Sequence, residues 1–137
     1  MGKLFGTDGI RGIVGDDLTT ELKNVVLFNK VQVPHYNYVG DSVLGYRAHM
    51  GAGSITSNFK SDKSMVKVHG KEEIETGLRK FGSIIGNRVE VGCNSVLCPG
   101  TIIYPDSIIY PLTRVRGVIE ENTIMKDKDC KVKRKKI

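Results

Sequence analysis

Residues 85–120 read IGNRVE VGCNSV LCPGTI IYPDSI IYPLTR VRGVIE, six consecutive units of six residues. The first position of every unit is aliphatic, namely Ile85, Val91, Leu97, Ile103, Ile109 and Val115. The fifth position is small or β-branched in every unit, and Gly or Pro recurs at the second and third positions. A period of six fits neither a helix of about 3.6 residues per turn nor a simple strand alternation.

This period is typical of a coil with a triangular cross-section. Each unit would supply one flat side and one corner, so that three units complete a turn of about 18 residues. The first residue of each unit would point into an aliphatic stack, and glycine, proline or asparagine would provide the corner geometry. The sequence therefore predicts an all-β fold, a left-handed parallel β-helix built from hexapeptide repeats.

The same phase continues upstream. Comparable units open at Leu27, Val33, Val39, Leu44 and Met50, and Thr56 follows in register. The pattern breaks over residues 58–83, a polar and charged segment with a possible hairpin in MVKVHGKEEIETG (65–77). This break predicts one long loop extruded from the coil. Long loops in compact domains tend to be functional or disordered. The β-helix domain would span residues 21–125.

The formal net charge of the 137-residue chain is +6, and it resides almost entirely in residues 126–137. That segment contains seven Lys or Arg and two Asp, so the remainder is close to neutral. A basic tail on a neutral body is usually a solvated, frayed terminus, so we expect no nucleic-acid partner, and the sequence leaves open whether the tail is ordered.

The cysteines are Cys93, Cys98 and Cys130, an odd number with no CxxC pair. This usage predicts reduced thiols and a cytoplasmic location. The N-terminus lacks the apolar core of a signal peptide, and no apolar run approaches the roughly 18 residues of a membrane span. We therefore expect neither secretion nor a membrane partner.

Two motifs stand out, HYNYVGD at 35–41 and MGAGSITSN at 50–58. They resemble the H-x-x-Y-x-G-D and I-G-A-G-T-I-T-x-N segments of the acetyltransferase domain of the bifunctional N-acetylglucosamine-1-phosphate uridyltransferase/glucosamine-1-phosphate N-acetyltransferase. Related sugar-1-phosphate nucleotidyltransferases share a long loop with LRKFG, here residues 78–82. The resemblance covers residues 21–125. It implies transfer of acetyl from acetyl-CoA to the amine of glucosamine-1-phosphate, or a related amino-sugar 1-phosphate, in UDP-N-acetylglucosamine biosynthesis.

The resemblance implies roles for individual residues in binding and activating the sugar. His35 would be the general base that takes a proton from the sugar amine, as a neutral imidazole can near pH 7. Tyr38 and Asn58 would hold the sugar, and Lys23 would contact its phosphate. His49 occupies a sugar-side position where the family usually has Asn.

The resemblance also implies a site for acetyl-CoA. The Ala52 backbone and Cys93 would line the acetyl-CoA groove. Lys63 belongs with the substrate-binding residues and would approach the phosphates from the long loop. Direct acyl transfer needs a base, a positioned amine and a backbone donor for the thioester oxygen. It needs neither a metal nor a protein nucleophile, so acetyl-CoA is the only cofactor we expect.

The N-terminal segment resembles a different family. FGTDGIRG at 5–12 resembles the N-terminus of phosphoglucosamine mutase, and residues 1–18 match that family. In the acetyltransferase family an earlier coil, with an arginine that grips the sugar phosphate, precedes the segment ELKN (21–24). We therefore expect a mutase-like fragment over residues 1–20, no working mutase or nucleotidyltransferase, and an acetyltransferase site that lacks this arginine.

Two other functions stay open. The first is an inactive β-helix scaffold or binding domain left from a sugar nucleotidyltransferase. The second is a γ-type carbonic anhydrase, which needs three histidines around zinc; His35, His49 and His69 lack the paired spacing of that family.

Whichever function applies, the flat sides of a narrow coil would leave apolar surface exposed, which predicts a homotrimer.

Overall fold

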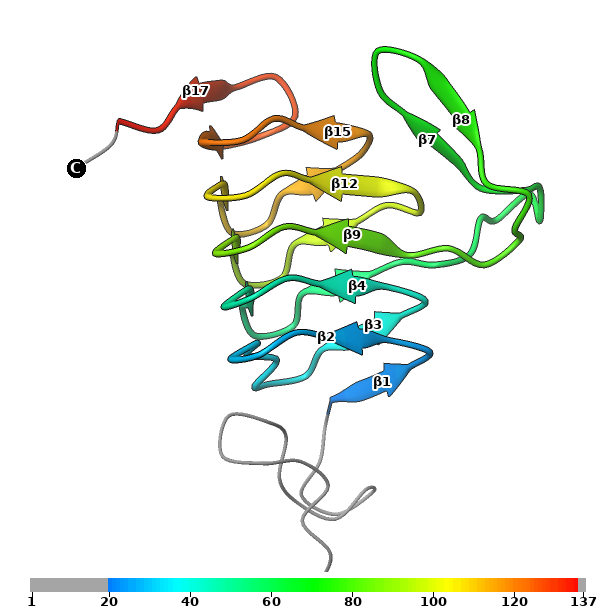
Figure 1. The fold of residues 1–137 in the computed structure, drawn as a ribbon, viewed down its shortest axis with the longest axis horizontal. Helices are drawn as coiled ribbons and strands as arrows, with labels where there is room; N and C mark the ends of the chain where they lie inside the picture. Colours follow the sequence, from blue (N-terminus) through cyan, green and yellow to red (C-terminus); the bar gives the residue numbers. More distant parts are fainter. Residues whose placement is uncertain (1–19, 136–137) are drawn as a thin grey trace, which may run out of the picture.

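The computed structural model describes residues 20–135, and within this range it contains strands and turns but no helix. The chain winds into a three-sided prism of stacked coils (Figure 1). The prediction of an all-β, left-handed parallel β-helix with one inserted loop is confirmed. The mutase-like segment lies outside the described residues, except for Thr20.

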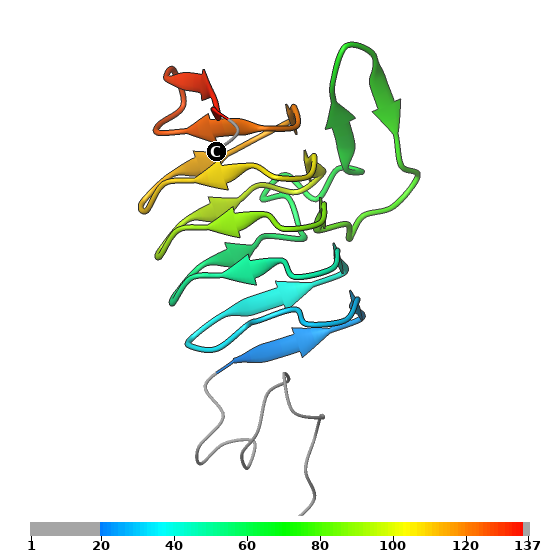
Figure 2. The same ribbon diagram turned by 60° about the vertical axis from the view of Figure 1, so that its left-hand side comes forward.

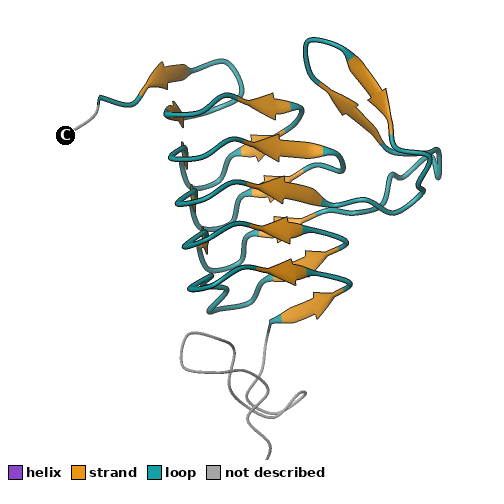
Figure 3. Cartoon of the chain, in the orientation of Figure 1, coloured by secondary structure: helices purple, strands orange, loops and turns teal. Residues whose placement is uncertain are grey.

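Three five-stranded sheets form the sides of the prism (Figure 3), and each is named here after the strand with the lowest number in it. The β1 sheet contains β1 (Glu21–Lys23), β3 (Tyr38–Gly40), β6 (Ile55–Thr56), β11 (Val96–Leu97) and β14 (Arg114–Val115). The β2 sheet contains β2 (Val26–Leu27), β4 (Val43–Leu44), β9 (Ser83–Ile85), β12 (Thr101–Ile103) and β15 (Val118–Ile119). The β5 sheet contains β5 (His49–Met50), β10 (Glu90–Val91), β13 (Ile108–Ile109), β16 (Thr123–Met125) and β17 (Lys131–Lys133).

The core is the aliphatic stack that the repeat predicts. All six first-position residues between Ile85 and Val115 are at most 2% exposed, and the upstream positions Val39, Leu44 and Met50 are fully buried. Burying one such side chain stabilises the fold by about 1.5–3 kcal/mol. Leu27, in the first described coil, is only partly buried.

The corners depend on residues with left-handed backbone. Non-glycine residues with φ between 47° and 61° recur at turns that follow one another from coil to coil. This conformation is unfavourable for residues other than Gly, Asn and Asp. Backbone hydrogen bonds between successive corners offset the cost, as between Arg88 N and the carbonyl of Tyr46 (2.8 Å).

The inserted loop, residues 58–82, leaves the coil after β6 and returns at β9; we call it the arm (Figures 1 and 2). It contains the expected hairpin, formed by β7 (Lys67–His69) and β8 (Glu73–Glu75). A Cβ atom added at Gly100 would lie 2.4 Å from the carbonyl oxygen of Lys67, and one at Gly117 would lie 2.6 Å from that of His69. The arm backbone therefore lies directly against two glycine corners of the coil.

The basic tail, whose order the sequence left open, extends the β5 sheet by one strand. Strand β17 pairs antiparallel with β16, and the amide of Arg134 donates to the carbonyl of Asn122 (2.7 Å). The tail is ordered here because it supplies hydrogen-bond partners to the otherwise open edge of the last coil.

Residues 20–135 include no helix long and apolar enough to cross a membrane.

Candidate functional site

His35, Ala52 and Cys93 lie one above another on a single corner of the prism, which we call the His35 corner. The amide of Gly53 donates to the carbonyl of His35 (2.9 Å), and the amide of Asn94 donates to the carbonyl of Ala52 (2.9 Å). Stacked strands are about 4.8 Å apart, so the three residues form a continuous column. The structure thus brings together the expected base and both residues expected to line an acetyl-CoA groove.

A buried amide fixes the backbone of this corner. Asn37 is 2% exposed, and its Nδ2 donates to the carbonyls of Gly51 (2.8 Å) and Ser54 (3.1 Å). Its Oδ1 accepts from the amide of His35 (3.0 Å). The imidazole of His35 is exposed and makes no hydrogen bond to a described residue. Its backbone is therefore held while both ring nitrogens stay available.

Tyr38 and Asn58 form a polar cluster on the β1 sheet. Asn58 Nδ2 donates to the Tyr38 hydroxyl (3.0 Å) and to Asp41 Oδ2 (2.6 Å). Asn24 Nδ2 donates to the other oxygen of Asp41 (3.1 Å). A Cβ atom at Gly40 would lie 2.6 Å from both Asn58 Nδ2 and the Tyr38 hydroxyl, so any larger residue there would displace these two groups.

Asp41 was not among the predicted site residues, although it is the last residue of the HYNYVGD motif. It carries the only carboxylate of the cluster and orients Asn58. Lys23 lies on the neighbouring strand β1, in register with Gly40, and its side chain is exposed. Lys23, Tyr38 and Asn58 therefore come from three neighbouring strands of the β1 sheet, namely β1, β3 and the end of β6.

His49 lies on a different side of the prism, in the β5 sheet. Its Nδ1 is 2.8 Å from Glu90 Oε2, and the two residues are in register on adjacent strands. They line a cavity of about 560 Å³ together with Lys30, Gln32, Arg47 and Arg88. Glu90 was not among the predicted site residues. It precedes Val91 as His49 precedes Met50, and the two six-residue units stack in register once the arm is left out.

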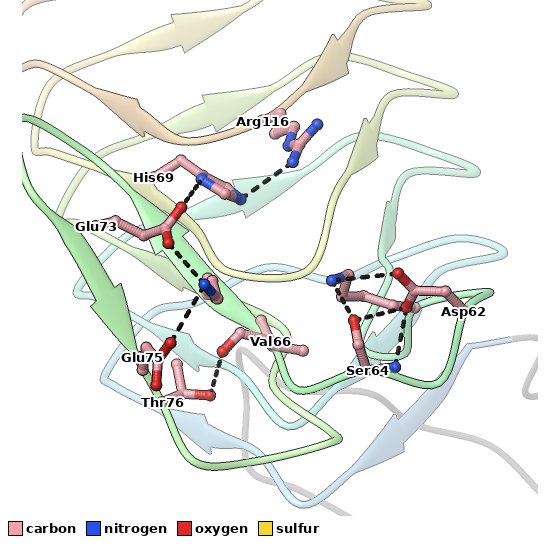
Figure 4. Close-up of polar contacts among 10 residues, drawn as sticks. Asp62, Ser64, Val66, His69, Glu73, Glu75, Thr76 and Arg116 are labelled. Atoms are coloured by element: carbon pink, nitrogen blue, oxygen red, sulfur yellow. Dashed lines mark hydrogen bonds and ion pairs between the residues drawn. The ribbon is translucent and has the colours of Figure 1, made fainter.

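Lys63 is in an exposed turn of the arm, where its amide donates to the carbonyl of Lys60 (3.0 Å). Its side chain makes no hydrogen bond or ion pair with the other expected site residues. Lys60 instead forms a local cluster with Ser64 and Asp62, whose carboxylate is 3.6 Å from the Lys60 ammonium (Figure 4). The amide of Ser64, its hydroxyl and then Lys60 lower the pKa of Asp62.

A second cavity, of about 480 Å³, separates the arm from the β1 sheet. Its lining includes Ser57, Phe59, Lys60, Lys67, His69, Cys98, Arg114 and Arg116. A chain of polar contacts links lining residues of this cavity to the hairpin of the arm (Figure 4). Arg116 Nη2 is 3.1 Å from His69 Nε2, His69 Nδ1 is 3.2 Å from Glu73, and Glu73 is 2.8 Å from Lys67.

The ion pair between Lys67 and Glu73 changes the titration of both groups. Lys67 donates hydrogen bonds to Glu73 and Glu75, which raise the pKa of Lys67, and the hydrogen bond from Lys67 lowers the pKa of Glu73. Both groups are exposed, so the pair contributes little stability in water.

The three histidines lie on separate parts of the described chain, at the His35 corner, in the β5 sheet and on the arm. Residues 20–135 contain no group of three or more His, Cys, Asp or Glu side chains that could hold a metal ion. The described residues therefore offer no three-histidine zinc site within one chain.

No protein-family model matches the chain. It is 35% identical over 120 residues to the bifunctional protein GlmU of Methanococcus aeolicus, covering 85% of this chain and 29% of that protein. It is 38% identical over 94 residues to a bifunctional sugar-1-phosphate nucleotidylyltransferase/acetyltransferase of Sulfurisphaera tokodaii, covering 68% of this chain and 23% of that protein. The chain thus spans less than a third of the length of these relatives.

Solved structures of acetyltransferases share the fold. The acetyltransferase domain of PglB from Neisseria gonorrhoeae superimposes with a TM-score of 0.61 at 13% identity, covering 84% of this chain and 45% of that chain. PerB from Caulobacter crescentus, in complex with CoA and GDP-perosamine, gives a TM-score of 0.51 at 14% identity, covering 85% of this chain and 52% of that one. These likenesses and the relatives support the resemblance to an acetyltransferase domain. The mutase-like origin of residues 1–18 stays a prediction.

Proposed function

We propose that the β-helix is an amino-sugar N-acetyltransferase that uses acetyl-CoA as donor and an amino-sugar 1-phosphate, such as glucosamine-1-phosphate, as acceptor. The observation that carries the proposal is the His35 corner, where His35, Ala52 and Cys93 form one column. The Tyr38–Asn58 cluster continues from it onto the β1 sheet. Relatives whose names include acetyltransferase activity support the same assignment.

In this mechanism His35 acts as a general base. The sugar amine attacks the thioester carbonyl carbon, and the imidazole of His35 accepts a proton from the amine. The carbon–sulfur bond breaks, and the departing CoA thiolate takes up that proton as CoA-SH. The amides of Ala52 and Cys93 donate to no described residue, so either is available to the oxyanion that forms on the thioester oxygen.

The remaining residues are assigned to the substrates. Lys23, Tyr38 and Asn58 would bind the sugar phosphate across the three neighbouring strands β1, β3 and β6. Asp41, through its 2.6 Å hydrogen bond, would fix the orientation of Asn58. His49 would meet the acceptor from the β5 sheet and Lys63 from the arm. Since these two lie away from the Tyr38–Asn58 cluster, they would reach the acceptor from a neighbouring copy.

We further propose that this neighbouring copy belongs to a homotrimer. The His35 corner is a convex edge, and a convex edge cannot enclose a substrate without a second surface. The β2 sheet carries an uninterrupted outward stripe of β-branched residues, aligned by the strand register: Val26, Val43, Ile84, Ile102 and Val118. A stripe of this kind marks an interaction surface, and we assign it to the trimer contact.

A pair of matched variants tests the trimer. Ile84 in the β2 sheet is 39% exposed and Val96 in the β1 sheet is 38% exposed. Ile84→Lys is expected to convert the trimer to a monomer in light-scattering measurements, whereas Val96→Lys is expected to leave the trimer intact. A wild-type monomer, or equal effects of the two variants, would reject the assigned interface.

Thiol release from acetyl-CoA in the presence of glucosamine-1-phosphate tests the enzymatic proposal. His35→Ala is expected to lower kcat about 10²–10⁴-fold, the usual contribution of a general base. Lys128→Ala, in the exposed tail, is the control and retains full activity. Activity that persists unchanged in His35→Ala would refute the assigned base.

One observation favours the alternative of a non-enzymatic scaffold. The imidazole of His35 has no hydrogen-bond partner among the described residues to orient it, whereas catalytic bases are usually oriented by a third group. A folded trimer that acetylates no amino-sugar phosphate would establish this alternative over the enzyme.

We also propose a cytoplasmic location and a mutase-derived front end. The three cysteines are free, which suits a reducing compartment. Residues 1–18 would contribute no mutase chemistry, and deleting them is expected to leave thiol release unchanged.

A further inference from the structure

The side chain of His69 joins the hairpin of the arm to the coil (Figure 4). Its Nε2 lies 3.1 Å from Nη2 of Arg116, which follows strand β14 of the coil. Its Nδ1 lies 3.2 Å from Glu73, which belongs to strand β8 of the same hairpin. One ring nitrogen of His69 therefore contacts the coil, and the other contacts the arm itself.

The two partners determine which nitrogen of His69 carries the hydrogen. A guanidinium group can only donate, so Nε2 must be without a hydrogen and must accept from Arg116. The hydrogen bond from Lys67 lowers the pKa of Glu73, which keeps this carboxylate charged down to about pH 5. A charged carboxylate can only accept, so Nδ1 carries the hydrogen and donates to Glu73. Both contacts therefore form together only with the neutral imidazole in this tautomer.

Protonation of the imidazole acts differently on the two contacts. Histidine is the side chain that ordinarily changes its charge between pH 5 and 8. In the charged form Nε2 also carries a hydrogen, so it cannot accept from Arg116, and two positive groups then face each other. Nδ1 still donates to Glu73, and this hydrogen bond becomes a charge-assisted one. The added proton therefore weakens the contact between arm and coil and strengthens the contact within the arm.

The other charged groups around His69 do not offset the repulsion from the coil. Among the described residues, the coil contributes Arg114, Arg116 and the thiol of Cys98 to the lining of the 480 Å³ cavity, and no carboxylate. The remaining charged groups near the cavity belong to the arm and pair with one another, as Lys60 with Asp62 and Lys67 with Glu73 and Glu75. A protonated His69 therefore faces a coil surface whose charged lining residues are both cations.

We propose that His69 and Arg116 form a pH-sensitive latch that holds the arm on the coil. At pH 8 the neutral imidazole accepts from Arg116, and the hairpin lies against Gly100 and Gly117. Near pH 5 the protonated imidazole is repelled by Arg116, the hairpin leaves the two glycine corners, and the cavity beneath it opens. The latch goes beyond the proposed acetyl transfer, because it concerns the position of the arm whatever reaction the coil catalyses.

NMR spectra of the full chain from pH 8 to pH 5 test the latch through the amide signal of Gly100, which lies against the carbonyl of Lys67. In the wild type this signal is expected to shift in one step as the hairpin leaves. A glutamine amide is neutral and offers both a donor and an acceptor, so His69→Gln and Arg116→Gln are expected to keep the signal constant. Arg114→Gln removes an exposed arginine of β14 and is the matched control, which retains the step.

Thiol labelling measures the opening of the cavity independently. Cys98 lines the cavity and is half-buried, whereas Cys93 is exposed on the His35 corner. After brief treatment with methyl methanethiosulfonate, the ratio of labelled Cys98 to labelled Cys93 is expected to be about tenfold higher at pH 5 than at pH 8, as a loss of about 1.4 kcal/mol in docking implies. In His69→Gln the ratio should stay constant. A wild type that does not change with pH, or a step that persists in His69→Gln or Arg116→Gln, would overturn the proposal.

Discussion

The coiled body and the arm show two different ways of stabilising one chain. In the body every coil repeats the same inward residues, and the stack from Val39 to Ile119 is almost fully buried. In the arm, residues 58–82, the buried apolar side chains are Val66 and Val68. Other aliphatic residues of the arm, Met65, Ile74 and Leu78, are more than half exposed. The body is therefore stabilised by its own buried core, whereas the arm depends on its contacts with the body.

The energies of the two regions differ accordingly. A buried aliphatic side chain contributes about 1.5–3 kcal/mol, and the body has many of them. Exposed ion pairs such as Lys67–Glu73 contribute about 0–1 kcal/mol each. Segments with few buried contacts open first, so the arm should detach while the body remains folded.

The largest expected effect concerns the body, and strand β13 offers a matched pair. Ile109 points inward and is 1% exposed, whereas Ile108, beside it, points outward and is half-buried. Ile109→Ala should cost about 2–5 kcal/mol of unfolding free energy, because it leaves a cavity in the stack. Ile108→Ala should cost less than about 1.5 kcal/mol. Urea denaturation followed by circular dichroism measures both, and similar losses would mean that the aliphatic stack is not the main source of stability.

An intermediate effect is expected where the arm meets the body. Alanine at Gly100, where φ is 81°, would place its Cβ 2.4 Å from the backbone oxygen of Lys67 and displace the arm. Gly77 has φ of 68° but no atom within 4 Å of its would-be Cβ. Both alanine variants are strained by about 1–2 kcal/mol, but only Gly100→Ala should also undock the arm.

Limited trypsin digestion distinguishes these two glycine variants. Cleavage after Lys71 should become about tenfold faster in Gly100→Ala, as a docking loss of about 1.4 kcal/mol implies. It should change little in Gly77→Ala. If the two variants are cleaved equally fast, the glycine corner is not what seats the arm.

The same contrast explains what the sequence could predict. The body was predictable because each six-residue unit carries its own inward residue and corner, and neighbouring units stack without outside information. The sequence also predicted the hairpin, but not where the hairpin packs on the coil. Gly100 and Gly117 accept the arm backbone, and only the folded coil places them opposite Lys67 and His69.

The candidate site divides along similar lines. The motifs indicated His35, Tyr38 and Asn58 because these residues are close in sequence, and the structure places them on one corner and its adjoining sheet. Glu90 lies 41 residues from His49 and meets it only because the arm is left out of the coil. Contacts that depend on how many residues an insertion removes cannot be read from local spacing.

The smallest effect concerns the ion pairs of the arm. The hydrogen bond from Lys67 lowers the pKa of Glu73 below its ordinary value of 4.5. The stabilising contribution of Glu73 is therefore present above pH 4.5 and is lost as the pH falls through the lowered value. Lys67, whose pKa is raised above 10.5, contributes fully below pH 10.5 and loses its contribution as the pH rises through the raised value.

Glu73→Gln and Glu72→Gln isolate the acidic part of this dependence. The side chain of Glu72 makes no hydrogen bond or ion pair with a described residue, so it is the matched control. Amide exchange at Val68 should be faster in Glu73→Gln than in wild type at pH 6, and the difference should vanish well below pH 4.5. Glu72→Gln should match wild type at both pH values. A difference that persists in acid would mean that Glu73 stabilises the arm by packing and not by its charge. The arm would then be stabilised in the same way as the body.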